Sequence, residues 1–137
     1  MSPASPTYVL DSFALMVYLS DEPGMRQVEE ILSLAEKQEC RVVLCMINLG
    51  EVLYMTERRR GLTKAQQVLA LVESLPLELM DATRDLVLDA AHIKAHHPLS
   101  YADAFVVAVC LRERGVVLSG DPDFYDVESL VQIEWLG

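Results

Sequence analysis

The sequence predicts a three-layer α/β fold, in which a mostly parallel sheet of about four to five strands carries helices on both faces. Short apolar segments typical of strands alternate along the chain with longer segments of helical periodicity. The strand candidates over residues 7–10, 41–45 and 116–119 are mostly apolar, as expected of strands that are buried on both faces. A length of 137 residues with 52% hydrophobic and 23% charged residues suits one folded domain over residues 1–137.

The first half of the chain contains two predicted strands and three predicted helices. We expect strands over residues 7–10 and 41–45, and helices over residues 12–19, 25–38 and 47–60. The breaker Asp-Glu-Pro-Gly at residues 21–24 ends the first helix, and Gly61 ends the third. Apolar residues recur every three to four positions through the second helix. Residues 1–6 are expected to form a loose tail.

The second half continues the alternation of helices and strands. Thr63 can cap a helix that Pro76 breaks, and Ser100 can cap a helix that Gly115 closes. We expect helices over residues 83–96 and 100–114, and strands over residues 77–80, 116–119 and 131–135. Because ligands of parallel sheets bind outside the carboxyl ends of the strands, residues that directly follow strands are the candidates for chemistry.

Composition and charge exclude several classes of function. A formal net charge of −10, from 21 acidic and 11 basic residues, disfavours a protein that coats nucleic acid or an anionic membrane by bulk charge. The longest apolar run, residues 104–111, is too short to span a membrane. The first basic residue is Arg26, so we expect no secretory leader. The three cysteines have no metal-binding spacing and suit a reduced, cytoplasmic protein.

Four carboxylates stand out from this acidic background. Residues 1–20, 42–56 and 95–111 each contain a single charged side chain, and these are Asp11, Glu51 and Asp103. Asp11 ends the first strand, and Asp121 follows the strand over residues 116–119. Asp103 and Glu51 lie in the first and second turns of helices. These positions all map to one edge of a parallel sheet, where the four carboxylates are expected to converge.

Such a cluster repels itself unless protons or cations neutralise it. At about 6 Å and an effective dielectric constant near 20, each ionised pair costs roughly 3 kcal/mol. Hard oxygen ligands without histidine or cysteine suit Mg²⁺ or Mn²⁺, and such ions bind phosphates and activate water.

Each acid also has a structural interpretation that the sequence leaves open. Asp11 can cap the helix that begins at Ser12, and Asp103 fits the fourth position of a capping box that begins at Ser100. Glu51 can face solvent on its helix, and Asp121 before Pro122 is a common turn opening.

The segments around these acids resemble the PIN-domain ribonucleases, in particular the VapC toxins of bacterial and archaeal toxin–antitoxin pairs. The motifs that carry the resemblance are, in chain order, TYVLDSFALMVYL, INLGEVLY, LSYADAFVVAVCLRERG and VVLSGDPDF. They cover almost the whole chain at spacing similar to that of the family.

The resemblance implies a metal-dependent endoribonuclease with a PIN-like fold. Its four acidic site residues, catalytic and metal-binding, are by this resemblance Asp11, Glu51, Asp103 and Asp121. One or two Mg²⁺ or Mn²⁺ ions among them would activate water for attack on an RNA phosphate, leaving a 5′-phosphate. The resemblance also implies a cognate antitoxin as partner and a homodimer, for which the apolar excess of residues 47–55 and 63–72 leaves surface.

Four further residues have expected supporting roles. Ser119 takes the place of the family's hydroxyl residue, and Ser12 either orients Asp11 or caps the helix. Asn48, one turn before Glu51, either reaches the site or caps its own helix. Asp123 is expected to be peripheral, as an acid of a turn or helix start. Gly50 is a poor helix former within a predicted helix.

One basic cluster remains, comprising Arg58, Arg59, Arg60 and Lys64. These residues can contact the RNA backbone, or they can be solvated cations that the dipole at a helix end favours.

Two other classes of function compete with the nuclease. A PIN-like module without activity could act as a binding or regulatory protein, although all four acids are present. A receiver-like phospho-acceptor domain needs an acidic pair after its first strand and a lysine late in the sheet. Only Asp11 follows the first strand here, and no lysine follows Lys94.

Overall fold

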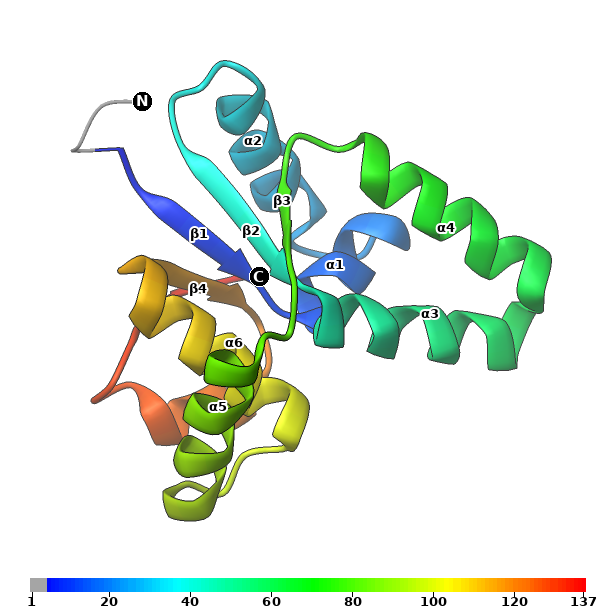
Figure 1. Cartoon of the computed structure of the whole chain (residues 1–137). Coiled ribbons are helices and arrows are strands. Elements are labelled where there is room, and N and C mark those ends of the chain that lie inside the picture. The colour runs from blue at the N-terminus through cyan, green and yellow to red at the C-terminus, as the bar shows by residue number, and fades with distance from the viewer. Residues whose placement is uncertain (1–4) are drawn as a thin grey trace.

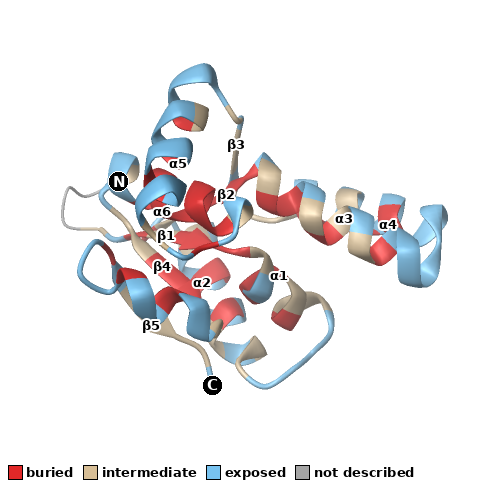
Figure 2. Cartoon of the chain, turned by 90° about the horizontal axis from the view of Figure 1, so that it is seen from below, coloured by how far each residue is buried: buried red, intermediate tan, exposed pale blue. Residues whose placement is uncertain are grey.

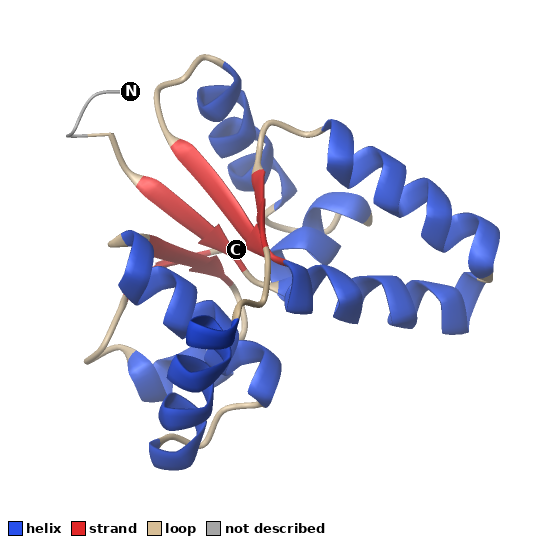
Figure 3. Cartoon of the chain, in the orientation of Figure 1, coloured by secondary structure: helices blue, strands red, loops and turns tan. Residues whose placement is uncertain are grey.

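The computed structural model describes residues 5–137 and contains one parallel sheet within them (Figures 1 and 3). Its strands are β1 (Thr7–Leu10), β2 (Arg41–Cys45), β3 (Glu78–Met80), β4 (Val116–Ser119) and β5 (Gln132–Trp135). They lie in the order β3-β2-β1-β4-β5, and all four pairings are parallel. The predicted parallel α/β architecture is confirmed.

Helices cover both faces of this sheet. They are α1 (Ser12–Leu19), α2 (Met25–Glu36), α3 (Met46–Arg60), α4 (Leu62–Ser74), α5 (Arg84–His96), α6 (Tyr101–Glu113) and the 3₁₀ helix η1 (Pro122–Val127). Side chains alternate across the central strands, so that Val9 packs with α5, α6 and η1 while Leu10 packs with α1 to α4. Two apolar cores therefore lie on opposite faces, which gives the three predicted layers.

Helix α6 is the most deeply buried helix of the fold. Eight consecutive residues of it are buried, from Asp103 to Cys110. Such a helix is apolar on all sides except at the carboxylate, as expected for a central element. The backbone at this point therefore holds Asp103 in a fixed position relative to the sheet.

Helices α3 and α4 form a hairpin whose far end projects from the body of the molecule (Figures 1 and 2). They are joined at Gly61, which has a positive φ of 90° that glycine adopts readily. Gly50 lies exposed within α3, and a side chain at this position would meet open space. It therefore neither breaks the helix nor allows another element to approach closely.

Several local boundaries differ from the prediction. Gly61 rather than Thr63 precedes α4, because the helix begins at Leu62 and Thr63 lies inside it. The sequence does not predict the 3₁₀ helix η1, since a six-residue turn has no apolar periodicity of its own. Residues 1–4 of the predicted tail lie outside the described part of the chain. Pro6, directly before β1, accepts a hydrogen bond from the Arg41 N–H at 3.0 Å, so this end of the predicted tail is attached to β2.

Within residues 5–137, no helix is long and apolar enough to cross a membrane.

Candidate active site

Asp11 lies at the carboxyl end of β1 and is almost completely buried, with 1% of its surface exposed. One carboxylate oxygen accepts a hydrogen bond from the Ala14 N–H at 2.8 Å, which makes Asp11 the N-cap of α1. The other accepts a short hydrogen bond from the Ser119 hydroxyl. The Asp11 side chain therefore both caps α1 and lies at the carboxyl edge of the sheet.

Ser119 connects Asp11 to the next acid along the edge. It ends β4, the strand paired with β1, and its Oγ accepts a hydrogen bond from the Asp121 N–H at 2.9 Å. The Asp121 carboxylate in turn accepts from the Asp123 N–H at 2.9 Å and caps η1. This chain of bonds fixes the loop after β4 against the end of β1.

Asp103 approaches the same edge from the first turn of α6. The Ser100 hydroxyl accepts from its N–H at 3.1 Å, as the predicted helix cap requires. One oxygen atom from each of Asp103, Asp121 and Asp123 lies within 4.8 Å of the others. The sequence predicts a peripheral Asp123, but the turn of η1 brings its carboxylate into this group.

Glu51 lies half-buried in the second turn of α3, and its carboxylate accepts a short hydrogen bond from the Ser12 hydroxyl. Ser12 therefore orients Glu51 and not Asp11, and the N-cap of α1 is Asp11 rather than Ser12, so both roles expected for Ser12 are wrong. Glu51 is near enough to Asp103 for its charge to raise the pKa of the Asp103 carboxyl.

Asn48 is fully buried in the first turn of α3. It does not cap this helix, because the N-cap is Cys45. Its Nδ2 donates to the Ala102 carbonyl oxygen at 3.2 Å, which links α3 to the start of α6. No residue within 5–137 donates a hydrogen bond to its Oδ1.

Two of the carboxyl groups have strongly raised pKa values. Burial is the main cause at Asp11, where the pKa rises from 3.8 to about 7 despite hydrogen bonds that lower it, and the charges of Asp103 and Asp121 add to the rise. Burial and then the charge of Asp121 raise the pKa of Asp103 to about 6. The edge thus concentrates negative charge in an environment that penalises it.

This donor set fits a hard divalent cation. All of its side-chain donors are oxygen atoms, and no histidine or cysteine belongs to the group formed by Asp103, Asp121 and Asp123 in the described residues. Mg²⁺ and Mn²⁺ prefer such ligands, and a bound cation would offset both the burial and the repulsion that raise the two pKa values. Asp11 and Glu51 flank the group and complete its acidic surroundings.

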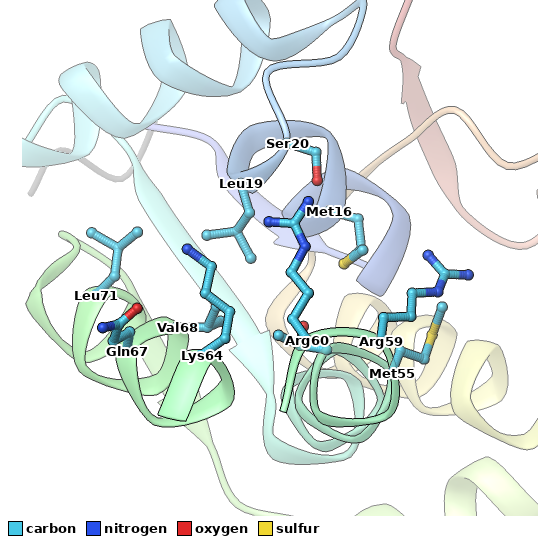
Figure 4. Close-up of a pocket in the computed structure, with 11 residues that line it drawn as sticks. Met16, Leu19, Ser20, Met55, Arg59, Arg60, Lys64, Gln67, Val68 and Leu71 are labelled. Carbon is cyan, nitrogen blue, oxygen red and sulfur yellow. The ribbon is translucent and has the colours of Figure 1, made fainter. Parts of the chain in front are cut away.

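The basic cluster of Arg58, Arg59, Arg60 and Lys64 lies elsewhere, at the far end of the α3–α4 hairpin. Arg59, Arg60 and Lys64 line a cleft of about 280 Å³ between α1, α3 and α4. Figure 4 shows the side chains of Arg60 and Lys64 extending toward the end of α1, over a partly apolar lining. Arg58 instead lies 5.1 Å from the centre of the Tyr54 ring. Within residues 5–137, none of these four cations forms an ion pair.

Sequence reasoning missed three features of this edge, which are the approach of Asp123, the bond from Ser12 to Glu51 and the bond from Asn48 to Ala102. The first had a local signal, because aspartate before proline favours a turn in which its side chain accepts a backbone N–H two residues on. The other two join residues 39 and 54 positions apart, and no local pattern encodes them.

Several solved structures are similar to this chain over almost its whole length. Among solved structures, VapBC2 of Rickettsia felis bound to a promoter DNA fragment is similar with a TM-score of 0.76 and 15% identity, over 96% of this chain and 99% of that one. Mycobacterium tuberculosis VapC20, a sarcin–ricin loop cleaving toxin, is similar with a TM-score of 0.69 and 22% identity, over 92% of this chain and 97% of that one. FitAcB of Neisseria gonorrhoeae is similar with a TM-score of 0.68 and 17% identity, over 92% of this chain and 95% of that one.

These similarities show a shared fold. No match was found among the curated proteins. The PIN domain family model matches residues 8–130, a span that contains every strand from β2 to β4, most of β1 and all five carboxylates of the edge. The chain therefore belongs to the PIN domain family.

Proposed function

We propose that this protein is a divalent-metal-dependent endoribonuclease and the toxin of a type II toxin–antitoxin pair. The observation that carries the proposal is the convergence of Asp103, Asp121 and Asp123 beside the buried Asp11 at the carboxyl edge of the sheet. Membership in the PIN domain family and the fold shared with VapC toxins support it. Asp11, Glu51, Asp103 and Asp121 are the proposed catalytic and metal-binding residues, and Asp123 joins them as a fifth acid.

The proposed mechanism divides the work between the metal and the protein. A bound Mg²⁺ or Mn²⁺ would neutralise phosphate charge, activate water and stabilise the departing 3′-oxygen, so that the product carries a 5′-phosphate. Asp103, Asp121 and Asp123 would hold the ion together with Asp11 and Glu51, which flank them. The Ser119 and Ser12 hydroxyls keep Asp11 and Glu51 in place by donating hydrogen bonds to their carboxylates. Such fixed orientation reduces the reorganisation that catalysis requires.

The receiver-like alternative does not fit the observed fold. Receiver-type sheets have the strand order 2-1-3-4-5, whereas this sheet has the order β3-β2-β1-β4-β5. An inactive PIN-like module is disfavoured because the chain holds five acids at one edge, where burial penalises the charge of two of them. Such an arrangement is costly without a cation to bind.

Cleavage of RNA by the full chain tests the proposal directly. We expect cleavage with Mn²⁺ or Mg²⁺ and none with excess EDTA, because the carboxylates alone repel phosphate. Denaturing gel electrophoresis detects the products, and a phosphatase shows whether they carry a 5′-phosphate. Binding of RNA without cleavage in Mn²⁺ would support the inactive module instead.

The proposed protein partners are an antitoxin and a second copy of the chain, in the cytoplasm. Supporting this, the α3–α4 hairpin exposes several large apolar side chains, which are Met46, Tyr54, Leu62 and Leu71. The three cysteines are free and buried, as suits a reducing compartment.

The basic cluster is proposed to contact the RNA backbone. Replacing Arg58, Arg59 and Arg60 with alanine should reduce the salt dependence of RNA binding, by about 0.7 in the slope of log K against log salt for each phosphate that the variant no longer neutralises. Binding is measured by fluorescence anisotropy in the Asp11→Asn background, which prevents cleavage. A control that replaces Arg84, Lys94 and Arg112 removes the same charge from α5 and α6. Equal slopes for the two triple variants would leave these arginines as solvated cations at a helix end.

A further inference from the structure

Asn48 is a fully buried polar residue whose hydrogen-bonding capacity is only partly used. Leu49 and Val52, one and four residues later in α3, belong to the apolar core under α1 to α4. The carbonyl oxygen of Ala102 can only accept, so the amide group facing it at 3.2 Å must be the Nδ2 donor. The Oδ1 atom is then the buried acceptor to which no residue within 5–137 donates.

A leucine of similar size would fill this buried position without leaving an unsatisfied oxygen. Buried amide oxygens without a donor are rare in proteins, because burial removes their hydrogen bonds to water. Such an atom points to a donor that is supplied from outside the chain, such as an ordered water or a ligand.

The position of Asn48 relates it to two carboxylates at once. Glu51 lies three residues later in α3, and residues spaced in this way occupy one face of a helix. Asp103 directly follows Ala102, the residue whose carbonyl Asn48 contacts. The Asn48 amide therefore links the two helices that bring Glu51 and Asp103 to the sheet edge.

We propose that Asn48 is a positioning residue of the metal site. Its Nδ2 holds the start of α6 against α3 and so sets the separation of Glu51 and Asp103. Its Oδ1 accepts a hydrogen bond from water that accompanies the divalent ion. The inference rests on the proposed metal-dependent function, and it predicts that the protein binds its cation less tightly without this amide.

The Asn48→Leu variant separates this role from a merely structural one. It removes the unsatisfied oxygen together with the donor, which offsets the lost hydrogen bond to the Ala102 carbonyl, so the melting temperature in EDTA should stay close to that of the wild type. The affinity for Mn²⁺, measured by isothermal titration calorimetry on the full chain, should fall by about tenfold or more, as for other residues that support metal ligands.

Thr56→Val provides the matched control on the same helix. Thr56 is buried and its hydroxyl donates to the Val52 carbonyl oxygen at 2.8 Å, within α3 and away from the carboxylates. Its substitution should leave the Mn²⁺ affinity within about twofold of the wild-type value, because it touches none of the residues that support metal ligands. If leucine at position 48 prevents folding, the smaller Asn48→Ala variant removes the same two groups without a clash and should lose Mn²⁺ affinity as well.

Each result bears on the inference. An Mn²⁺ affinity of Asn48→Leu or Asn48→Ala equal to that of the Thr56→Val control would overturn it and leave the proposed nuclease function intact. A melting temperature that falls in EDTA, with unchanged Mn²⁺ affinity, would assign Asn48 a structural role alone. A wild-type chain that binds no Mn²⁺ would overturn both the inference and the proposed function.

Discussion

Replacing Asp11 with asparagine is expected to lower the rate of RNA cleavage by on the order of a thousandfold, comparable to the loss of a transition-state contact in other enzymes. Asparagine has nearly the size of aspartate, and its Oδ1 can still accept from the Ala14 N–H that begins α1. Its Nδ2 faces the Ser119 hydroxyl oxygen, which can accept as well as donate. The substitution thus removes the negative charge and keeps the local structure.

The same variant should be more stable than the wild type at pH 8 in EDTA. The buried Asp11 carboxylate is ionised there at a cost, because its pKa of about 7 lies far above the ordinary 3.8. Cleavage is measured on one RNA at saturating Mn²⁺, and stability by thermal denaturation. Asp126→Asn is the control, since Asp126 is an exposed acid of η1 outside the carboxylate group. Wild-type cleavage by Asp11→Asn would show that the catalytic centre is elsewhere.

The fold was predictable because the apolar pattern of the strands agrees with their burial on both faces of the sheet. The strands β1, β2 and β4 are apolar on both faces, and both cores depend on that pattern through the alternation of Val9 and Leu10. The convergence of Asp11, Asp103 and Asp121 followed from a geometric rule, since the carboxyl ends of parallel strands meet at one edge.

The interactions that orient these acids were not predictable in the same way. From the sequence, the Ser12 hydroxyl could bond to Asp11 beside it or to a distant residue. The packing of α1 against α3 places Glu51 within hydrogen-bonding distance of Ser12 and so selects Glu51 as the partner. The approach of Asp123 depends on a short 3₁₀ helix whose sequence signal is that of an ordinary turn. Side-chain orientation within the site is a property of tertiary packing, which local patterns do not contain.

The net charge of −10 acquires a different meaning once its distribution is known. Carboxylates in the ion-paired network of Arg41, Glu78 and Glu113 are compensated at the opposite end of the sheet. Those at the carboxyl edge have no such basic partner among the described residues, and two of them have raised pKa values. The uncompensated negative charge is therefore concentrated at the carboxyl edge of the sheet, where a bound cation could contact a phosphate.

This local charge should make the stability of the metal-free protein fall as pH rises from about 4 to about 7. Across that window the folded chain holds protons on Asp11 and Asp103, with pKa values of about 7 and about 6, whereas the unfolded chain has released them. The folded state therefore binds more protons, and the free energy of unfolding decreases with pH, by several kcal/mol in total. At more acidic pH the trend reverses, because the Arg41 hydrogen bond lowers the pKa of Glu78, and the stability that this bond contributes is lost as Glu78 is protonated.

Mn²⁺ should offset part of this loss, since a ligand that binds only the folded state stabilises it by mass action, by about 2.7 kcal/mol at one hundred times its dissociation constant. Urea denaturation at pH 5, 6, 7 and 8, with EDTA and with Mn²⁺, measures both effects. Asp11→Asn should flatten the pH dependence in EDTA, whereas Asp126→Asn should retain it. A free energy of unfolding that rises between pH 5 and pH 8 in EDTA would mean that the buried carboxylates are already compensated within the protein, and the physical reason for a cation at this edge would be lost.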